Sequence, residues 1–242
     1  MNFGRSKSDS EIDFIVNTIK GVDILLIQEV VAEDPGGAQA VARLGQALNK
    51  TGAKWEYRIS DVTTGANSYK RERYAILWKP SVVTLVGKPW LEKRFNLEID
   101  REPFYATFKY DKKEFTVVNF HAVTKHMQPE TEIKYFKFLP AEYSHLNLLF
   151  FGDFNLPQAH SVFNPLKSMG YKAALKDQKT SLRQDCKNDD CLSSQFDNCF
   201  YNSKSINHES SSVIHFYRSF PDFKQARKIS DHVPIVVRFK CK

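Results

Sequence analysis

The chain has 242 residues, of which 42% are hydrophobic, 26% charged and 13% aromatic; these proportions suit a folded globular protein and exclude collagen-like and disordered chains. Its 35 Lys and Arg residues against 28 Asp and Glu residues give a formal net charge of +7, which favours polyanionic partners such as nucleic acids or phosphate-bearing ligands. No apolar run approaches the roughly 20 residues that a membrane-spanning helix needs, so no membrane span is predicted.

The first part of the chain alternates helices with a buried strand. Ser8 and Glu11 form a capping-box pattern ahead of branched residues at helical spacing, which predicts an amphipathic helix that ends at Gly21. The run from Val22 to Val30 is too short and too rich in branched residues for another helix, and it predicts a buried strand. Residues 38–49 predict a second amphipathic helix.

The rest of the chain is rich in short β-type runs. Strands are expected at residues 55–60, 74–79, 82–86, 104–110, 115–121, 146–151, 196–201 and 233–240, and helical turns within 129–143 and 161–170. The strongest strands are apolar on both faces, which predicts a mixed α/β (α+β) four-layer sandwich of two mostly antiparallel sheets flanked by helices. No linker or repeat divides the chain, so we expect a single domain over residues 1–242.

Four cysteines are too few for a disulfide scaffold. Cys186 and Cys191 are close enough in sequence for one local bridge. The alternative, a zinc knuckle, would need His208 as a fourth ligand, and the spacing favours structural cysteines instead.

Polar residues stand at the ends of the most apolar strands. Glu29 and His121 each end one strand, Gly152-Asp153-Phe154-Asn155 follows another, and Ser230-Asp231-His232 precedes the last. Side chains at strand ends are held by a rigid scaffold and still reach a ligand, so these groups can converge. Singly, each has an ordinary alternative, such as an ion pair, a core histidine or an Asx turn. As a set without a nucleophilic Ser or Cys beside a base, they suit a hard divalent cation and an activated water.

In this order and at these separations, the blocks resemble the endonuclease/exonuclease/phosphatase superfamily, and within it the deoxyribonuclease I-like branch. Three segments match the family's signature blocks: Gln28-Glu29-Val30, residues 152–155 and residues 230–232. His121 matches the strand end at which the family carries a histidine. Residues 67–74, Asn-Ser-Tyr-Lys-Arg-Glu-Arg-Tyr, and the block Arg101-Glu102-Pro103 are similar to segments of the deoxyribonuclease branch.

The resemblance implies a divalent-metal-dependent phosphodiesterase, an endonuclease that hydrolyses DNA by in-line attack of water with Mg²⁺ (or Mn²⁺ or Ca²⁺). The catalytic residues that it implies are His121, His232, Glu72, Asp197, Asp153 and Asn155; the metal ligands are Glu29 and Asp231; and the DNA contacts are Tyr69 and Arg101. Each imidazole would be paired with a carboxylate, His121 with Glu72 and His232 with Asp197, which would fix its tautomer and stabilise its charged form.

The chain departs from the family pattern in two places. Val31 stands where the family nuclease has an arginine that reads the DNA groove, so the resemblance implies no detailed DNA preference. The family's first strand carries an Asn a few residues before the Phe-Gly pair matched by Phe3-Gly4, and this chain starts too late to include it. We therefore expect a domain that lacks its first strand. Truncation of the sequence is favoured over natural loss of that strand.

Two alternatives to a DNA endonuclease stay open. One is a phosphoinositide or sphingomyelin phosphoesterase of the same superfamily, although no exposed aromatic loop stands out, and the other is a binding protein with a disabled site. We expect a DNA substrate, no protein partner and a monomer. The first nine residues contain no signal peptide, yet secretion is slightly favoured over the cytoplasm because it is common in this branch.

Overall fold

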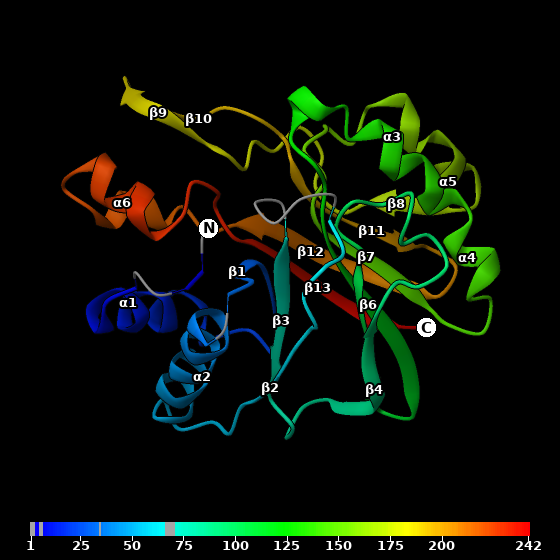
Figure 1. Cartoon of the computed structure of the whole chain (residues 1–242), viewed down its shortest axis with the longest axis horizontal. Helices are drawn as coiled ribbons and strands as arrows, with labels where there is room; N and C mark the ends of the chain where they lie inside the picture. The colour runs from blue at the N-terminus through cyan, green and yellow to red at the C-terminus, as the bar shows by residue number, and fades with distance from the viewer. Residues whose placement is uncertain (1–2, 5–6, 34, 66–70) are drawn as a thin grey trace.

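The computed structural model describes residues 3–4, 7–33, 35–65 and 71–242 (Figure 1). A six-stranded sheet has the order β4 (Thr84–Leu91), β5 (Phe104–Tyr110), β6 (Lys113–His121), β7 (Leu148–Asp153), β11 (Asp197–Asn202) and β8 (Tyr171–Ala173). A three-stranded sheet has the order β1 (Ile24–Val31), β3 (Glu72–Trp78) and β2 (Glu56–Ile59). Two further pairs are β12 (Ile206–Val213) with β13 (Ile235–Cys241) and β9 (Leu182–Lys187) with β10 (Asp190–Leu192).

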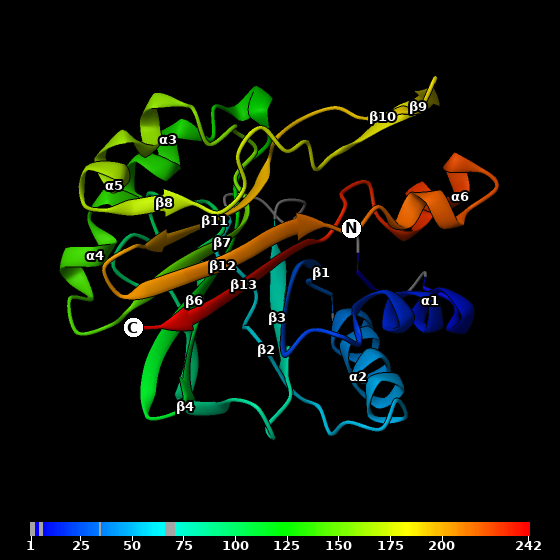
Figure 2. The ribbon, with the colours of Figure 1, turned by 180° about the vertical axis from the view of Figure 1, so that it is seen from behind.

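The helices lie on the outer sides of the sheets. They are α1 (Asp9–Ile19), α2 (Gly36–Asn49), α3 (Glu130–Ile133), α4 (Leu139–Glu142), α5 (Asn164–Ser168) and α6 (Phe223–Ile229), with 3-10 turns at Lys125–Met127, Lys134–Lys137, Ser161–Phe163 and Phe216–Ser219. Figure 1 shows α1 and α2 on one flank of the molecule and α3, α4 and α5 on the other, with the sheets between them. In the reverse view, β12 and β13 cross side by side in front (Figure 2).

Three separate hydrophobic clusters fill the interfaces between the layers. One lies between α1, α2 and the three-stranded sheet, one between the sheets, and one between the six-stranded sheet and α3 to α5. Strand β3 illustrates the alternation: Ala75 and Leu77 face the helices, whereas Tyr74, Ile76 and Trp78 face the other sheet. Three interfaces define four layers, so the predicted α/β four-layer sandwich of mostly antiparallel strands is confirmed; the pair β6 and β7 is parallel.

Most of the predicted elements occur within a few residues of their expected places. The capping box of α1 is formed on both sides: the Ser8 hydroxyl accepts from the Glu11 amide at 3.2 Å, and the Glu11 carboxylate accepts from the Ser8 amide at 2.7 Å. The strands β8, β9, β10 and β12 and the helix α6 were not predicted.

The hairpin of β9 and β10 is closed by a disulfide between Cys186 and Cys191, the pairing that the sequence spacing allowed. Cys199 and Cys241 are free. Among the helices of the described residues, none combines the length and the apolar composition needed to cross a membrane.

Candidate active site

The site forms where strands of the two sheets end together. Because β6 and β7 are parallel and in register, His121 lies directly opposite Asp153 at the last paired position. Asp197, at the start of the antiparallel neighbour β11, is in turn paired with Asp153. Glu72, the first residue of β3, reaches the same place from the other sheet, because its carboxylate contacts His121. Long-range strand pairing therefore gathers these four side chains.

Gly152 permits the close approach of β6 and β7. It has a φ of 148°, a backbone conformation that L side chains rarely adopt, and a Cβ atom built there would lie 1.8 Å from the Phe120 carbonyl oxygen. Both features require glycine at this position. Gly152 thus lets Asp153 lie beside His121.

We expect Gly152→Ala to lower the free energy of unfolding by roughly 3 kcal/mol or more, because strained φ and overpacking each cost about 1–3 kcal/mol. Urea titration monitored by tryptophan fluorescence would measure the loss. Gly21→Ala is the matched control, since a Cβ at Gly21 has no neighbour within 4 Å. The control is expected to change stability by less than about 1 kcal/mol; equal losses in both variants would contradict this account.

The first imidazole is held by a buried carboxylate. His121 Nδ1 lies 2.9 Å and 3.1 Å from the two carboxylate oxygens of Glu72, and Arg101 Nη1 donates to the same carboxylate at 3.2 Å. Burial alone would raise the pKa of Glu72, but the charges of His121 and Arg101 lower it overall. Burial likewise opposes the charged form of His121, yet Glu72 raises its pKa above the ordinary value. Glu72 therefore fixes Nδ1 and leaves Nε2 of His121 on the side of Glu29 and Asp153.

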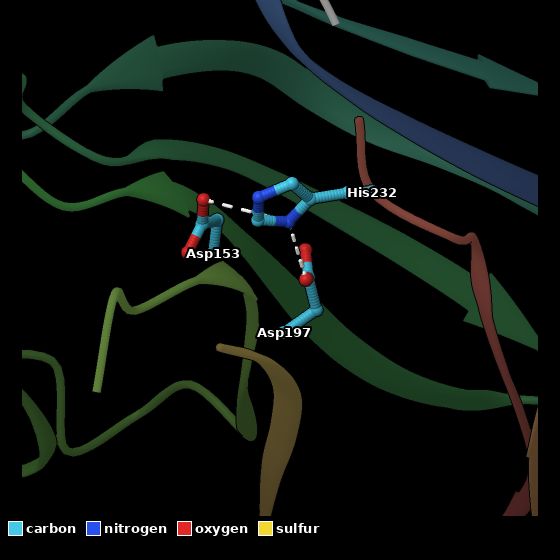
Figure 3. Close-up of side chains that lie close together, drawn as sticks. All are labelled: Asp153, Asp197 and His232. Carbon is cyan, nitrogen blue, oxygen red and sulfur yellow. Dashed lines mark hydrogen bonds and ion pairs between the residues drawn. The ribbon is translucent and has the colours of Figure 1, made fainter. Parts of the chain in front are cut away.

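The second imidazole is likewise held at Nδ1 by a carboxylate. His232 Nδ1 lies 2.6 Å from Asp197 Oδ2 and 3.7 Å from Asp153 Oδ2 (Figure 3). Burial would lower the pKa of His232, but Asp197 and then Asp153 raise it to about 10. The Thr180 hydroxyl supports this pair by accepting from the Asp197 amide at 2.9 Å, and the Thr180 carbonyl accepts from the Val233 amide at 2.8 Å.

Asp153 connects the two pairs. Its Oδ2 atom lies 3.7 Å from Nε2 of His121 as well as 3.7 Å from Nδ1 of His232. Burial and the neighbouring charge of Asp197 raise the pKa of Asp153, while the two histidines oppose that shift. Glu29 completes the cluster, since its Oε1 lies 3.8 Å from His121 Nε2.

Backbone irregularities aim two of these side chains. Glu29 has a φ of 58° at an irregularity in the pairing of β1 with β3 between Ile27 and Val30, and such bulges redirect side chains at active sites. Asn155 has a φ of 50°; its amide donates to Asp153 Oδ1 at 2.8 Å, and its Nδ2 donates to the Ala122 carbonyl at 3.1 Å. The second contact ties the end of β7 to the end of β6.

The donor set fits a divalent cation. One ligand atom each of Asp153, Asp197 and His232 lies within 4.8 Å of the others, and carboxylate oxygens suit hard cations such as Mg²⁺. Glu29, whose side chain is 36% exposed, offers a further carboxylate near Nε2 of His121, the same nitrogen that Asp153 approaches. The three-residue group includes neither of the two predicted metal ligands, Glu29 and Asp231; of the two, Glu29 lies beside it.

The other predicted residues fall in three situations. The Asp231 side chain is exposed and is not part of the three-residue cluster, while its carbonyl accepts from the Leu182 amide. The Arg101 side chain is only 11% exposed and contacts Glu72 and the Ala122 carbonyl. Its contact with DNA stays a prediction. Tyr69 lies outside the described residues.

Besides Thr180, the sequence analysis missed two further supporting residues. The Tyr74 hydroxyl accepts from the His121 amide and donates to the Arg101 carbonyl, both at 3.3 Å. Glu132 is buried and accepts from the amides of Val123 at 2.6 Å and Asp100 at 3.0 Å. Tyr74 falls in the segment that resembles the deoxyribonuclease branch, and that resemblance could have identified it. No sequence signal marks Glu132, because acidic residues in a Glu- and Lys-rich stretch usually face solvent.

This fold, with two His–carboxylate pairs at the ends of its central strands, matches a known family over nearly its whole length. The profile of the Endonuclease/Exonuclease/phosphatase family matches residues 1–232, and the chain belongs to this family.

Two curated relatives are deoxyribonucleases by name. The chain is 30% identical over 259 aligned residues to mouse Deoxyribonuclease-1-like 2, which covers 99% of this chain and 88% of the relative. It is 33% identical over 162 residues to a Deoxyribonuclease of Thioalkalivibrio sp. (strain K90mix), which covers 61% of this chain but only 42% of that protein.

Solved structures share the fold at low sequence identity. An endonuclease/exonuclease/phosphatase family protein from Leptotrichia buccalis has a TM-score of 0.68 at 17% identity and covers 98% of this chain and 95% of its own. Zebrafish (D. rerio) TDP2 complexed with a single-strand DNA product has a TM-score of 0.65 at 13% identity and covers 97% and 94%.

Proposed function

We propose that this protein is a divalent-metal-dependent endonuclease that hydrolyses phosphodiester bonds of DNA. The observation that supports this most directly is the pair of imidazoles, each held at Nδ1 by a carboxylate, on either side of Asp153. The deoxyribonuclease relatives and the net charge of +7 support a nucleic acid substrate.

In this proposal, different residues hold the cation, transfer protons and contact the DNA. Asp153, Asp197 and Glu29 would hold the cation, with Asp231 as a further predicted ligand; a bound cation would neutralise charge on the scissile phosphate. His121 and His232 would each exchange a proton through Nε2, one with the attacking water and one with the departing oxygen. Glu72 and Asp197 keep Nδ1 occupied, so each imidazole presents one defined nitrogen. Asn155 would orient the water, and Tyr69 and Arg101 would contact DNA.

Plasmid nicking tests the proposal. Supercoiled plasmid incubated with the protein and Mg²⁺ or Mn²⁺ should accumulate open circles, and an excess of EDTA should return the rate to that of the protein-free control, because carboxylates alone do not neutralise the phosphate. Added Mg²⁺ in excess over EDTA should restore nicking. The same protein should be tested on sphingomyelin and phosphoinositide vesicles: cleavage of lipid without nicking would favour the phosphoesterase alternative, and DNA binding without cleavage would favour the binding protein.

We also infer an oxidising compartment, and therefore favour secretion. The disulfide between Cys186 and Cys191 supports this inference, because disulfides persist mainly in oxidising environments.

A further inference from the structure

Two segments on one flank of the molecule bring apolar side chains together at the surface. The loop from β4 to β5 carries Phe95 and Leu97, and the 3-10 turn Lys134–Lys137, which lies between α3 and α4, carries Tyr135 and is followed by Phe138 (Figure 1). The ring centroid of Phe95 lies 5.7 Å from that of Tyr135 and 5.9 Å from that of Phe138. We call Phe95, Leu97, Tyr135 and Phe138 the apolar patch. Its two segments are far apart in the sequence, so only the fold reveals it.

Leu97 is held outward by the structure of its loop. The amides of Glu98 and Ile99 both donate to the Phe95 carbonyl, at 3.2 Å and 3.0 Å, which closes the loop into a turn. Ile99 is fully buried and Phe95 packs against the same core cluster, whereas Leu97 between them is 92% exposed and Phe138 is 45% exposed. Adjacent large apolar side chains that a fixed backbone holds in water mark an interaction surface.

Basic side chains accompany the patch on the same two segments, residues 92–99 and 134–138. Of the two acids in these segments, Glu92 is buried and accepts from the Tyr105 hydroxyl at 2.7 Å, so Glu98 is the exposed one. Four basic residues are exposed, and none of them forms an ion pair with another residue that the structure describes: Lys93, Arg94, Lys134 and Lys137. The surface therefore carries a local excess of positive charge and favours an anionic partner.

The arrangement of the rings argues against nucleic acid as that partner. Lys134 Nζ lies 5.2 Å from the ring centroid of Tyr135, and Lys137 Nζ lies 4.9 Å from that of Phe138. The rings of Phe95 and Phe138 are also stacked, with 23° between their planes. Single-stranded nucleic acids bind aromatic side chains by stacking bases on free ring faces. Here a lysine or a neighbouring ring already lies against the rings, and Leu97 has no ring to offer.

An anionic membrane surface satisfies both kinds of side chain. Its head groups attract lysine and arginine, and the boundary with the acyl chains accepts apolar side chains. Lysine suits this boundary because its stem can lie along apolar surface while its ammonium group stays at the level of the head groups. Lys134 and Lys137 lie in that way across the rings beside them.

We propose that the apolar patch and its four basic neighbours dock the protein on anionic membrane surfaces, with Leu97 and Phe138 inserted among the head groups and the four cations on lipid phosphates. This inference goes beyond the proposed function and does not rest on it. The loop that carries Leu97 continues to Arg101, which contacts Glu72 of the candidate site. A docked protein would therefore hold its candidate active site near the membrane.

Vesicle flotation tests the proposal. The protein is mixed, in EDTA and at an ionic strength of about 0.15 M, with vesicles of phosphatidylcholine alone or with about a third of phosphatidylserine. We expect it to bind the anionic vesicles at least about 10-fold more tightly than the neutral ones, and salt at about 1 M to release it. Leu97→Ser, and Lys134→Gln together with Lys137→Gln, should each weaken binding about 10-fold or more.

The matched controls lie at the other end of β5, where it turns into β6. Tyr110 is 44% exposed there, and Lys109 and Lys113 are exposed on either side of it. Tyr110→Ser, and Lys109→Gln together with Lys113→Gln, remove an exposed apolar side chain and the same amount of charge, and they should change vesicle binding by less than about twofold. Thermal unfolding of every variant would show that the fold is kept.

The outcomes distinguish the possible partners. No binding to anionic vesicles would overturn the proposal, and so would equal losses in the patch and control variants, which would mean that net charge alone attracts the protein. Weaker binding of a single-stranded oligonucleotide by the patch variants, with unchanged vesicle binding, would assign the surface to nucleic acid instead. A dimer that Leu97→Ser dissociates, in place of vesicle binding, would assign it to a second copy. The assay needs neither metal nor hydrolysis, so it stays informative even if plasmid nicking fails.

Discussion

Replacing either paired histidine by alanine should reduce plasmid nicking by about 100- to 10,000-fold, the usual contribution of a positioned acid or base. The reason is that a carboxylate holds Nδ1 of His121 at 2.9 Å and Nδ1 of His232 at 2.6 Å, so that Nε2 of each imidazole is the nitrogen available for proton transfer in the proposed function. Initial rates of conversion of supercoiled to open circular plasmid, in Mg²⁺ and at equal protein concentration, would measure the loss for His121→Ala and His232→Ala.

His145→Ala is the matched control, because His145 is an exposed histidine in the segment before β7. It should nick at the rate of the unmodified protein, within about twofold. Thermal unfolding of all three variants would show whether a lost activity reflects a lost fold. Retention of more than about a tenth of the activity by a folded His121→Ala or His232→Ala protein would contradict a proton-transfer role for that residue.

Replacing Glu72, the carboxylate partner of His121, should have a smaller effect on nicking than replacing the histidine itself. Glu72→Gln keeps the size of the side chain and removes the charge that raises the pKa of His121. We expect nicking to fall less than in His121→Ala, with an optimum shifted to lower pH because the imidazolium of His121 loses its stabilising anion. A pH profile of the nicking rate for the Glu72→Gln protein, measured beside that of the unmodified protein, would reveal the shift; superimposable profiles would exclude this role for Glu72.

How much of this site could be predicted from the sequence depends on how local each signal is. Glu29 and Asp153 stand two residues beyond the apolar runs 24–27 and 148–151, and His121 ends the mostly apolar run 115–120, so the local sequence indicates where each of these strands ends. The pairing of His121 with Glu72 spans 49 residues, so only the resemblance to the family indicated it. Glu132 accepts from the amide of Asp100, which is 32 residues away in the sequence, and nothing in the segment around Glu132 indicates that contact.

The missed elements have the same explanation. Strand β12 has the sequence Ile-Asn-His-Glu-Ser-Ser-Ser-Val, which is too polar to predict a strand, and it exists because seven of its eight residues find partners on β13. The strands β9 and β10 are short and mostly exposed, and the disulfide between Cys186 and Cys191 links them. In both places tertiary pairing outweighs the local preference of the chain.

Glu132 gives the chain an acid-dependent stability that can be measured. Burial raises the pKa of its carboxyl group from 4.5 to about 7, and the amides of Val123 and Asp100, which favour the anion, offset only part of that shift. Between these two pKa values, the folded protein holds a proton that the unfolded chain has released. The contribution of Glu132 to the free energy of unfolding is therefore greatest below pH 4.5 and declines as the pH rises toward 7.

Glu132→Gln should remove that decline. A shift from 4.5 to about 7 corresponds to about 3 kcal/mol, so relative to the unmodified protein the variant should gain about 3 kcal/mol in the free energy of unfolding between pH 4.5 and pH 8. Urea titrations of both proteins at the two pH values would give this double difference, in which every other titrating group cancels. Glu142→Gln, at an exposed position in α4, is the control and should show no such gain. Because Glu132 joins the backbone beside Arg101 to the backbone beyond His121, a flat double difference would mean that its carboxyl group is charged and hydrated at neutral pH, and that the loops supporting the first imidazole are more open than their hydrogen bonds indicate.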